Sequence, residues 1–333
     1  MNSSNFSLPD KSRYKDSGIR HVGFEIEYAG LSPEDSAEML EQLLGGERKR
    51  ISHFCYEVSS IKFGDFRIEI DADFLLEEKY KKYLSSIGVD LNKLETGSLD
   101  ELLLELASSV VPCEIVMPPI PVNELNIANK IVENLRDNKA KGTKDSIFYA
   151  FGLHINVEVA CIEPDYLLSI IRSFSLLYDW IVQHSKVDFA RRLSPYIDPY
   201  PDKYLKMIMN LEYEPGIDQL MRDYLKLVGS RNYALDMLPA FATINKDLVL
   251  SHAREPHLIK PRPAFHYRLA NSMVDDEEWN INHEWYYWLK IETLANNKHK
   301  LNELIGNYGE KLNSIIPFSR SGWVEQVEQT LDT

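Results

Sequence analysis

The sequence predicts an α+β fold in which a largely antiparallel sheet has helices packed on one face. Two segments, 21–31 and 147–159, alternate residues in the manner of strands with one buried face. The segment 164–184 instead spaces its apolar residues for a helix with one buried side. The 333 residues contain no internal repeat, and they suffice for one large domain or two smaller ones.

A helix is expected directly after the first strand. Ser32 can serve as its N-cap, Pro33 suits the first helical position, and the acids at 34–35 favour the positive end of the helix dipole. Gly45 and Gly46 would end this helix, because glycine readily adopts the left-handed conformation of a C-cap.

Three more strands are expected in the first half. Segments 50–59 and 65–74 have strand-like patterns, and Gly64-Asp65 marks the turn between them. Residues 75–110 are helical in pattern. The short strand 112–117 should then stop at the prolines that follow it.

The second half begins with a helix that Asn123 can cap and that runs to about Arg136. Glu163-Pro164-Asp165 would start the long helix that reaches about His184. A last strand is expected at 264–271, followed by an aromatic-rich helix at 276–298.

These elements predict one main domain over 20–298, between an N-terminal arm at 1–19 and a helical tail at 299–333. Within the domain, residues 185–262 are rich in proline, tyrosine and arginine. Such a stretch favours loops that cover a substrate site, with helical patches near 202–210 and 216–228.

The composition narrows the functional class. With 37 basic and 51 acidic residues, the formal net charge of −14 argues against binding to nucleic acid or to an anionic membrane. No apolar run is long enough to span a bilayer. The three widely spaced cysteines predict neither a disulfide framework nor a zinc knuckle, which favours a reducing cytoplasm.

Paired acids appear in the first strand, where Glu25 and Glu27 share one face. Two such carboxylates can each bind a hard cation such as Mg²⁺, although a lone pair of this kind also fits a solvated strand face. Glu69, on the strand at 65–74, repeats the pattern with the same two interpretations. Glu114 lies between apolar neighbours, where a carboxylate is costly to bury unless it is paired or bound to a cation.

The segment Gly152–Glu158 is the most informative one. His154, Asn156 and Glu158 share a strand face, and Gly152 would allow a phosphate to approach the backbone closely. A neutral histidine is a common metal ligand, but a histidine in a strand can equally be a structural hydrogen-bonding residue.

Arginines near the end of the predicted main domain are candidates for binding phosphate, because the guanidinium forms bidentate pairs with phosphate and carboxylate. Arg268 lies on the last strand, and Arg254 and Arg262 lie in the proline-rich stretch before it. Ion pairs with the many acids are the alternative, and they are favoured for Arg191 and Arg192.

Five motifs in this order resemble the amidoligase branch of the glutamine synthetase and glutamate–cysteine ligase superfamily. They are G-F-E-I-E-Y at 23–28, the acidic strand at 65–71, E-I-V-M-P-P at 114–119, G-L-H-I-N at 152–156 and H-Y-R-L-A-N-S at 266–272. The resemblance covers about residues 20–295. It implies a curved antiparallel sheet like the glutamine synthetase catalytic domain, with the site on its concave face.

The resemblance also implies a reaction in which ATP, with Mg²⁺ or Mn²⁺, phosphorylates a carboxylate that an amine then attacks. The carboxylate would belong to a small molecule or a peptide. The implied metal ligands are Glu25, Glu27, Glu69, Glu114, His154 and His266. Arg268, Arg262 and Glu114 would take part in catalysis, and the nucleotide would bind Arg254, Arg262, Arg268 and Asn156.

The sequence departs from the family pattern at three places. His266 replaces the usual glutamate, Asn156 stands where a second histidine is common, and Phe74 follows Asp73 in place of a small residue. His266 can still ligate a metal, but it removes a negative charge. Two alternatives therefore stay open, a non-catalytic binding protein and a guanidino kinase-like phosphotransferase on the same architecture.

Overall fold

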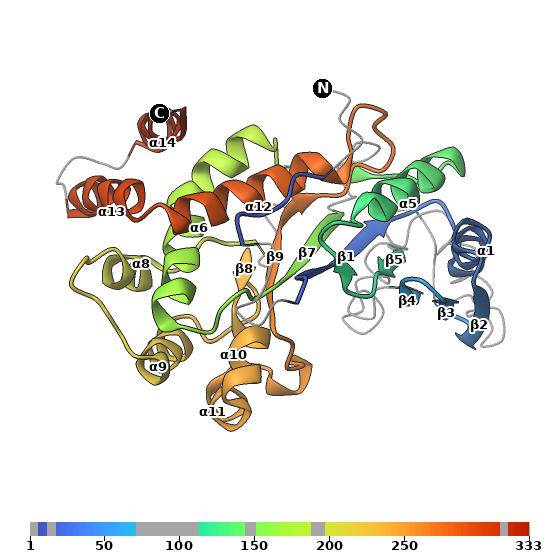
Figure 1. Ribbon diagram of the computed structural model, residues 1–333, viewed down its shortest axis with the longest axis horizontal. Helices are drawn as coiled ribbons and strands as arrows, with labels where there is room; N and C mark the ends of the chain where they lie inside the picture. Colours follow the sequence, from blue (N-terminus) through green and yellow to red (C-terminus); the bar gives the residue numbers. More distant parts are fainter. Residues whose placement is uncertain are drawn as a thin grey trace, which may run out of the picture.

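The computed structural model describes residues 6–11, 18–70, 113–143, 151–187, 197–313 and 319–332. Its described part is an open antiparallel sheet with helices packed around it, which confirms the predicted α+β class (Figure 1). The strands follow the order β2-β3-β4-β5-β1-β7-β9-β8, and β6 pairs with β1. Their bounds are β1 His21–Tyr28, β2 Glu47–Ser52, β3 Cys55–Ser60, β4 Gly64–Ile70, β5 Cys113–Val116, β6 Ile120–Pro121, β7 Gly152–Glu158, β8 Leu235–Asp236 and β9 Ala264–Asn271.

The apolar face of the sheet forms the core. Four helices pack on the sheet or on one another there: α1 (Pro33–Leu44), α5 (Asn126–Asp137), α6 (Pro164–His184) and α12 (Ile281–Asn296). Phe265 of β9 contacts Trp288 of α12 and Tyr166 of α6, with ring centroids 5.5 and 6.4 Å apart. Phe24 and Ile26 are fully buried on the same face, so the alternation in β1 correctly separates core from polar residues.

Helix α1 has the predicted ends. The Ser32 hydroxyl accepts a hydrogen bond from the backbone N–H of Asp35 at 3.1 Å, and Pro33 is the first helical residue. Gly45 adopts a left-handed conformation with φ 62°, and its N–H bonds to the carbonyl of Glu41. This conformation explains why glycine is suited to the C-terminal end.

Two local predictions are wrong. The segment expected as one strand at 50–59 is a hairpin, in which β2 ends at Ser52 and β3 begins at Cys55. The turn between them contains no glycine, so the sequence offers no marker for it. Helix α5 begins at Asn126 after Leu125 and has no side-chain cap, so Asn123 does not cap it.

The segment between α6 and β9 contributes to the core as well as to loops. Its elements are α8 (Asp202–Ile208), α9 (Ile217–Leu227), α10 (Leu238–Ile244), α11 (Lys246–His252) and the 3₁₀ turn Pro256–Leu258. Tyr200, Tyr204 and Tyr224 form a buried aromatic cluster, with ring centroids 5.3 to 5.8 Å apart. These tyrosines therefore support the helices and are not exposed on a lid.

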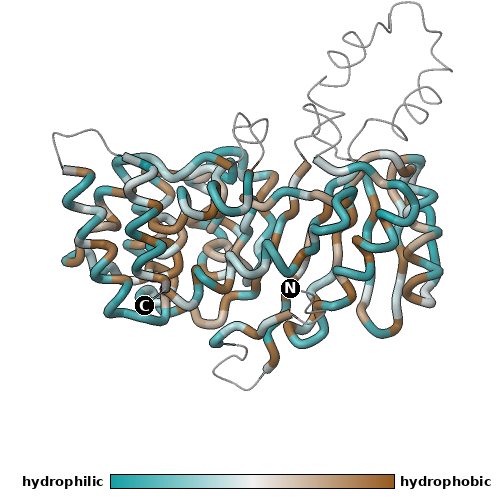
Figure 2. Tube along the Cα trace, turned by 90° about the horizontal axis from the view of Figure 1, so that it is seen from above, coloured by the Kyte–Doolittle hydropathy of each residue, from teal (hydrophilic) through white to brown (hydrophobic). Residues whose placement is uncertain are grey.

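The C-terminal residues form two helices, α13 (Lys298–Asn313) and α14 (Arg320–Asp332), and both contact α6. Trp323 is fully buried, and its indole N–H donates to the carbonyl of Leu176 at 2.9 Å. The packed core therefore extends to α14. Along the chain, hydrophobic and hydrophilic residues alternate at both the helical end and the sheet end of the molecule (Figure 2).

Residues 6–11 lie against the rest of the structure. The ring of Phe6 lies 6.3 Å from that of Phe24, and the indole N–H of Trp285 donates to the carbonyl of Ser7 at 2.8 Å. The predicted helix at 75–110, together with Asp73, Phe74, Arg191 and Arg192, lies outside the described residues.

Candidate active site

The register of the strands brings the predicted acids together on the polar face of the sheet. Glu27 of β1 lies opposite Glu114 of β5, which lies opposite Glu69 of β4. On the other side of β1, Glu25 lies opposite His154 of β7. Residues directly opposite in a sheet have neighbouring side chains, so one surface collects groups that are distant in the sequence.

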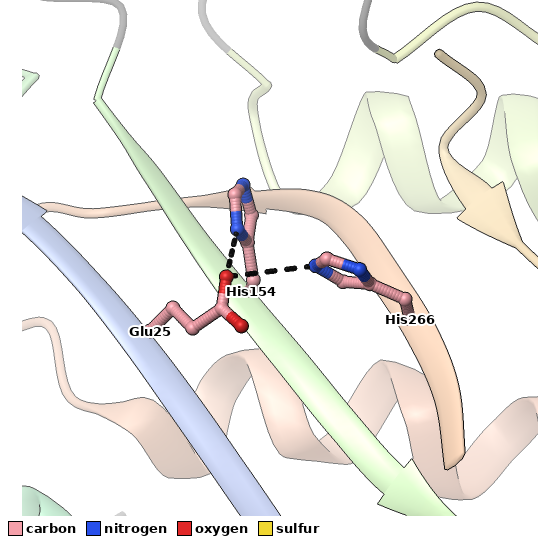
Figure 3. Close-up of side chains that lie close together, drawn as sticks. All are labelled: Glu25, His154 and His266. Carbon is pink, nitrogen blue, oxygen red and sulfur yellow. Dashed lines mark hydrogen bonds and ion pairs between the residues drawn. The ribbon is translucent and has the colours of Figure 1, made fainter. Parts of the chain in front are cut away.

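Glu25 is the centre of the first group of ligands. Its Oε2 lies 2.8 Å from Nδ1 of His154 and 3.6 Å from Nε2 of His266 (Figure 3). Its Oε1 accepts a hydrogen bond of 2.8 Å from the side-chain amide of Asn156 and lies 3.7 Å from the guanidinium of Arg262. Glu25, His154 and His266 each offer a ligand atom, and these atoms lie within 4.8 Å of one another.

The protonation of this group favours metal binding. Burial lowers the pKa of His266 to about 3, assisted by Arg268 and opposed by Glu25. Burial would raise the pKa of Glu25, but its contacts with His266 and His154 outweigh burial and hold the pKa well below its usual value. At neutral pH the pair is therefore a carboxylate facing a neutral imidazole, the forms in which both groups ligate metals.

Glu27 belongs to a second group, which contains Glu114 and again His154. The backbone N–H of Gly152 donates to Oε2 of Glu27 at 2.6 Å, and Nε2 of His154 lies 3.8 Å from Oε1 of Glu27. His154 thus presents one ring nitrogen to each of the two β1 carboxylates. Two adjoining sets of candidate ligands are suited to a pair of divalent ions, with a neutral His154 ring ligating one of the two.

Arg268 lies beside these groups, in the part of β9 where the pairing with β7 is irregular. The pairing of β7 with β9 shifts register between Leu153 and Ile155, which is the behaviour of a β-bulge. The side chain of Arg268 is 7% exposed, and its Nη2 lies 3.4 Å from Nδ1 of His266. A guanidinium can only donate, so Nδ1 of His266 is the acceptor in this contact.

Asp236, which the sequence analysis did not identify, is the counter-ion of Arg268. Its Oδ2 lies 3.9 Å from Nη2 of Arg268, and its Oδ1 accepts the backbone N–H of Leu238 at 2.9 Å. Burial raises the pKa of Asp236 to about 6, while Arg268 and Arg231 oppose the rise. The sequence does contain an indication of Asp236, because it lies within the apolar stretch 234–238. As with Glu114, a carboxylate between apolar neighbours is costly to bury unless it is paired or bound to a cation.

Three predicted residues lie toward the edge of the site. Glu69 is in line with Glu114, but its carboxylate pairs with Arg67 at 2.7 Å. Arg262 is half exposed beside Glu25. Arg254 is exposed and its backbone N–H bonds to Gly229, and within the described contacts its side chain makes no bond to the two groups of ligands.

A family model described as "Putative amidoligase enzyme" matches residues 18–290. The chain belongs to this amidoligase family. The match runs from just before β1 into α12, so it includes every site residue named above. No curated protein matches the chain. Membership of this family supports a ligase activity. None of the described helices has the length and apolarity needed to cross a membrane.

Proposed function

We propose that this amidoligase is an ATP-dependent carboxylate–amine ligase that uses Mg²⁺ or Mn²⁺. The observation that supports this function best is the pair of adjoining ligand groups, Glu25/His154/His266 and Glu27/Glu114/His154, beside the buried guanidinium of Arg268. An ATP-dependent ligase needs cations to hold a triphosphate next to a carboxylate, because both are negatively charged. This surface offers candidate ligands for such cations and the fixed positive charge of Arg268.

The residues present fit divalent ions. They combine carboxylate oxygens with neutral imidazole nitrogens, and Nε2 of His266 is a buried nitrogen without a hydrogen bond among the described residues. Glu25, Glu27, Glu114, His154 and His266 would hold the ions, with Glu69 at the end of the acidic row. Bound divalent ions would offset the repulsion between the triphosphate and the substrate carboxylate.

The proposed reaction has two steps. A carboxylate oxygen of the first substrate attacks the γ-phosphorus of ATP, and the bond to the bridging oxygen of ADP breaks. The amine then attacks the acyl carbon, the bond to the phosphate oxygen breaks, and the nitrogen loses a proton as the amide forms. Arg268 would bind the transferring phosphoryl oxygens, because planar guanidinium groups match phosphate.

Other chain residues prepare this arrangement. Asp236 holds Arg268 in place, and the amide of Asn156 orients Glu25 and so supports the ligand group from the side. Arg262, half exposed at the edge, is placed to meet a phosphate or carboxylate as it enters. Arg254 is a more distant candidate for the nucleotide.

Trapping the acyl phosphate tests the proposal directly. The purified protein is incubated with ATP, MgCl₂ or MnCl₂, a panel of carboxylic acids and peptides, and hydroxylamine, which converts an acyl phosphate into a stable hydroxamate. We expect hydroxamate and ADP in equal amounts with the true acid, and loss of both in Glu27→Gln and Glu114→Gln. Glu47→Gln, at an exposed position on β2, is the matched control.

The outcomes separate the alternatives. A stable phosphorylated product without an amide or hydroxamate would indicate a guanidino kinase-like phosphotransferase. A folded protein that binds no ATP in calorimetry with either ion would indicate a non-catalytic binding protein. Either result would overturn the ligase.

A further inference from the structure

The two ligand groups on the sheet differ in their donor atoms. Glu25, His154 and His266 form a group with one carboxylate and two imidazoles. Glu27 and Glu114 supply only carboxylates, and the second group obtains nitrogen only through the shared His154. Imidazole suits later transition metals such as Cu²⁺ and Zn²⁺, whereas carboxylate and water suit Mg²⁺ and Mn²⁺, so the two groups have different metal preferences.

His154 can serve only one ion at a time as a neutral imidazole, because one ring nitrogen then carries a proton. Its Nδ1 lies 2.8 Å from Glu25, while Nε2 lies 3.8 Å from Glu27. With Nδ1 ligating the ion at Glu25, the proton on Nε2 points toward the Glu27 carboxylate. This is the common arrangement in which a metal-bound histidine donates its other N–H to an acid.

His266 completes the nitrogen-rich group from β9. Its side chain is 13% exposed, its Nε2 faces Oε2 of Glu25 at 3.6 Å, and its ring centroid lies 5.2 Å from that of His154. Figure 3 shows both imidazoles directed at the same carboxylate. The three residues come from the neighbouring strands β1, β7 and β9, so the sheet itself fixes their spacing.

We infer that the Glu25/His154/His266 position binds a later transition-metal ion such as Co²⁺, Cu²⁺ or Zn²⁺ in preference to Mg²⁺, while the Glu27/Glu114 position accepts Mg²⁺. This inference rests on the metal-binding part of the proposed function. It adds that the two ions are chemically different, and that His266 sets the difference by supplying the second nitrogen.

Arg268 changes partner when this position fills. Without an ion, the guanidinium donates to Nδ1 of His266, so the ring proton is on Nε2. If Nε2 ligated an ion, its proton would leave to solvent and Nδ1 would take up another, so that Nδ1–H and the Arg268 guanidinium would be two donors facing each other. The Asp236 carboxylate, whose Oδ2 lies 3.9 Å from Nη2 of Arg268, is an acceptor toward which the guanidinium could then turn.

Metal titrations without any substrate test the inference. Protein stripped of metal is titrated with MgCl₂, MnCl₂ and CoCl₂ by calorimetry, for the wild type and for His266→Glu. Co²⁺ binds most sites more tightly than Mg²⁺, so the ratio of the Co²⁺ affinity to the Mg²⁺ affinity is compared between the proteins. We expect this ratio to fall at least tenfold in His266→Glu, and to stay unchanged in His21→Gln, whose histidine lies on β1 outside both groups.

Spectroscopy of the wild type gives a second readout that does not depend on a variant folding. Pulsed electron paramagnetic resonance of the Cu²⁺ complex should show coupling to imidazole nitrogen, and that coupling should weaken in His266→Glu. Equal affinity ratios in the two proteins, or a Cu²⁺ complex without nitrogen coupling, would overturn the inference. Neither readout involves turnover, so a failure of the ligase reaction would be seen separately.

Discussion

Glu25 and His154 lie directly opposite each other on β1 and β7, and their side chains meet at 2.8 Å although they are 129 positions apart in the chain. The contact is the meeting point of the two candidate ligand groups, because His154 also faces Glu27. The carboxylates of the two groups lie close together on one surface of the sheet. Their mutual repulsion should therefore affect the free energy of unfolding.

The first prediction concerns Glu27→Gln in metal-free protein. Glu27 and Glu114 are directly opposite, and like charges in that relationship destabilise a sheet. Glutamine keeps an oxygen to accept the N–H of Gly152 but removes the charge. We expect the free energy of unfolding in EDTA to rise by about 0.5–1 kcal/mol, measured by guanidinium denaturation.

Adding MgCl₂ or MnCl₂ should reverse the order of the two proteins. An ion that binds only the folded state stabilises it, and the wild type gains more because it keeps both carboxylates. Glu47→Gln should behave like the wild type throughout. A Glu27→Gln protein that is less stable than the wild type in EDTA would contradict the repulsion.

The second prediction concerns pH and Asp236, whose pKa in the folded protein is raised by burial to about 6 from a usual value of 3.8. The folded state therefore holds the proton more tightly than the unfolded state. This contribution to stability is complete below pH 4 and is lost as the pH rises through 6. The loss is about 2–3 kcal/mol for a shift of this size.

Asp236→Asn keeps the acceptor for the N–H of Leu238 and cannot ionise, so this contribution should vanish in the variant. The difference in the free energy of unfolding between variant and wild type should grow in favour of the variant from pH 4 to pH 6 and then stay constant. Curves that run parallel over this interval would show that Asp236 does not titrate there.

The third prediction concerns Arg268→Lys. Lysine keeps the positive charge but lacks the planar fork that can bind two phosphoryl oxygens. Removing a single donor to developing charge typically costs about 10²–10³-fold in rate, and we expect a loss of this order in kcat/KM for the ligase reaction. Arg222→Lys on the exposed side of α9 is the control.

Binding of a non-hydrolysable ATP analogue, followed by calorimetry with the metal present, separates positioning from folding. The Arg268→Lys protein should melt cooperatively and bind the analogue more weakly than Arg222→Lys does. Wild-type kcat/KM in Arg268→Lys would remove Arg268 from the proposed mechanism.

The fourth prediction concerns the predicted boundary at residue 299. Trp323 of α14 is fully buried against α6, so Trp323→Ala should lower the free energy of unfolding by about 3–5 kcal/mol in one cooperative transition. Tyr286→Ala, at a side chain that is 47% exposed, should change it by less than about 0.5 kcal/mol. A separate, earlier transition in Trp323→Ala would mean that the C-terminal helices unfold independently.

Patterns local to the sequence predicted much of the architecture. Period-two alternation gave β1 and β7 and separated the core residue Phe24 from its neighbour Glu25, because each strand buries one face only. Ser32 and Gly45 mark the ends of α1, since caps are recognised by residue type. The order of acids and histidine along the chain predicts that Glu25, Glu27, Glu114 and His154 belong to one site, and the strands bring these side chains close together.

The missed features depend on contacts that no local pattern records. Strand β8 has two residues, which are too few to show a period, so no sequence pattern indicates that Asp236 lies beside Arg268. The bulge in β9 likewise depends on pairing with β7. Strand β2 has no buried residue, so its sequence has no apolar face to detect.

The strand order has a consequence for how the protein is made. β1 lies between β5 and β7, and β9 pairs with β7, so the neighbouring side chains of Glu25, His154 and His266 come from the early, middle and late parts of the chain. Contacts between such distant segments slow folding, because long loops must close first. On the ribosome, β1 leaves well before β9, at about 5–20 residues per second. The nascent chain therefore passes through an interval in which its clustered acids lack their histidine and arginine partners from β9.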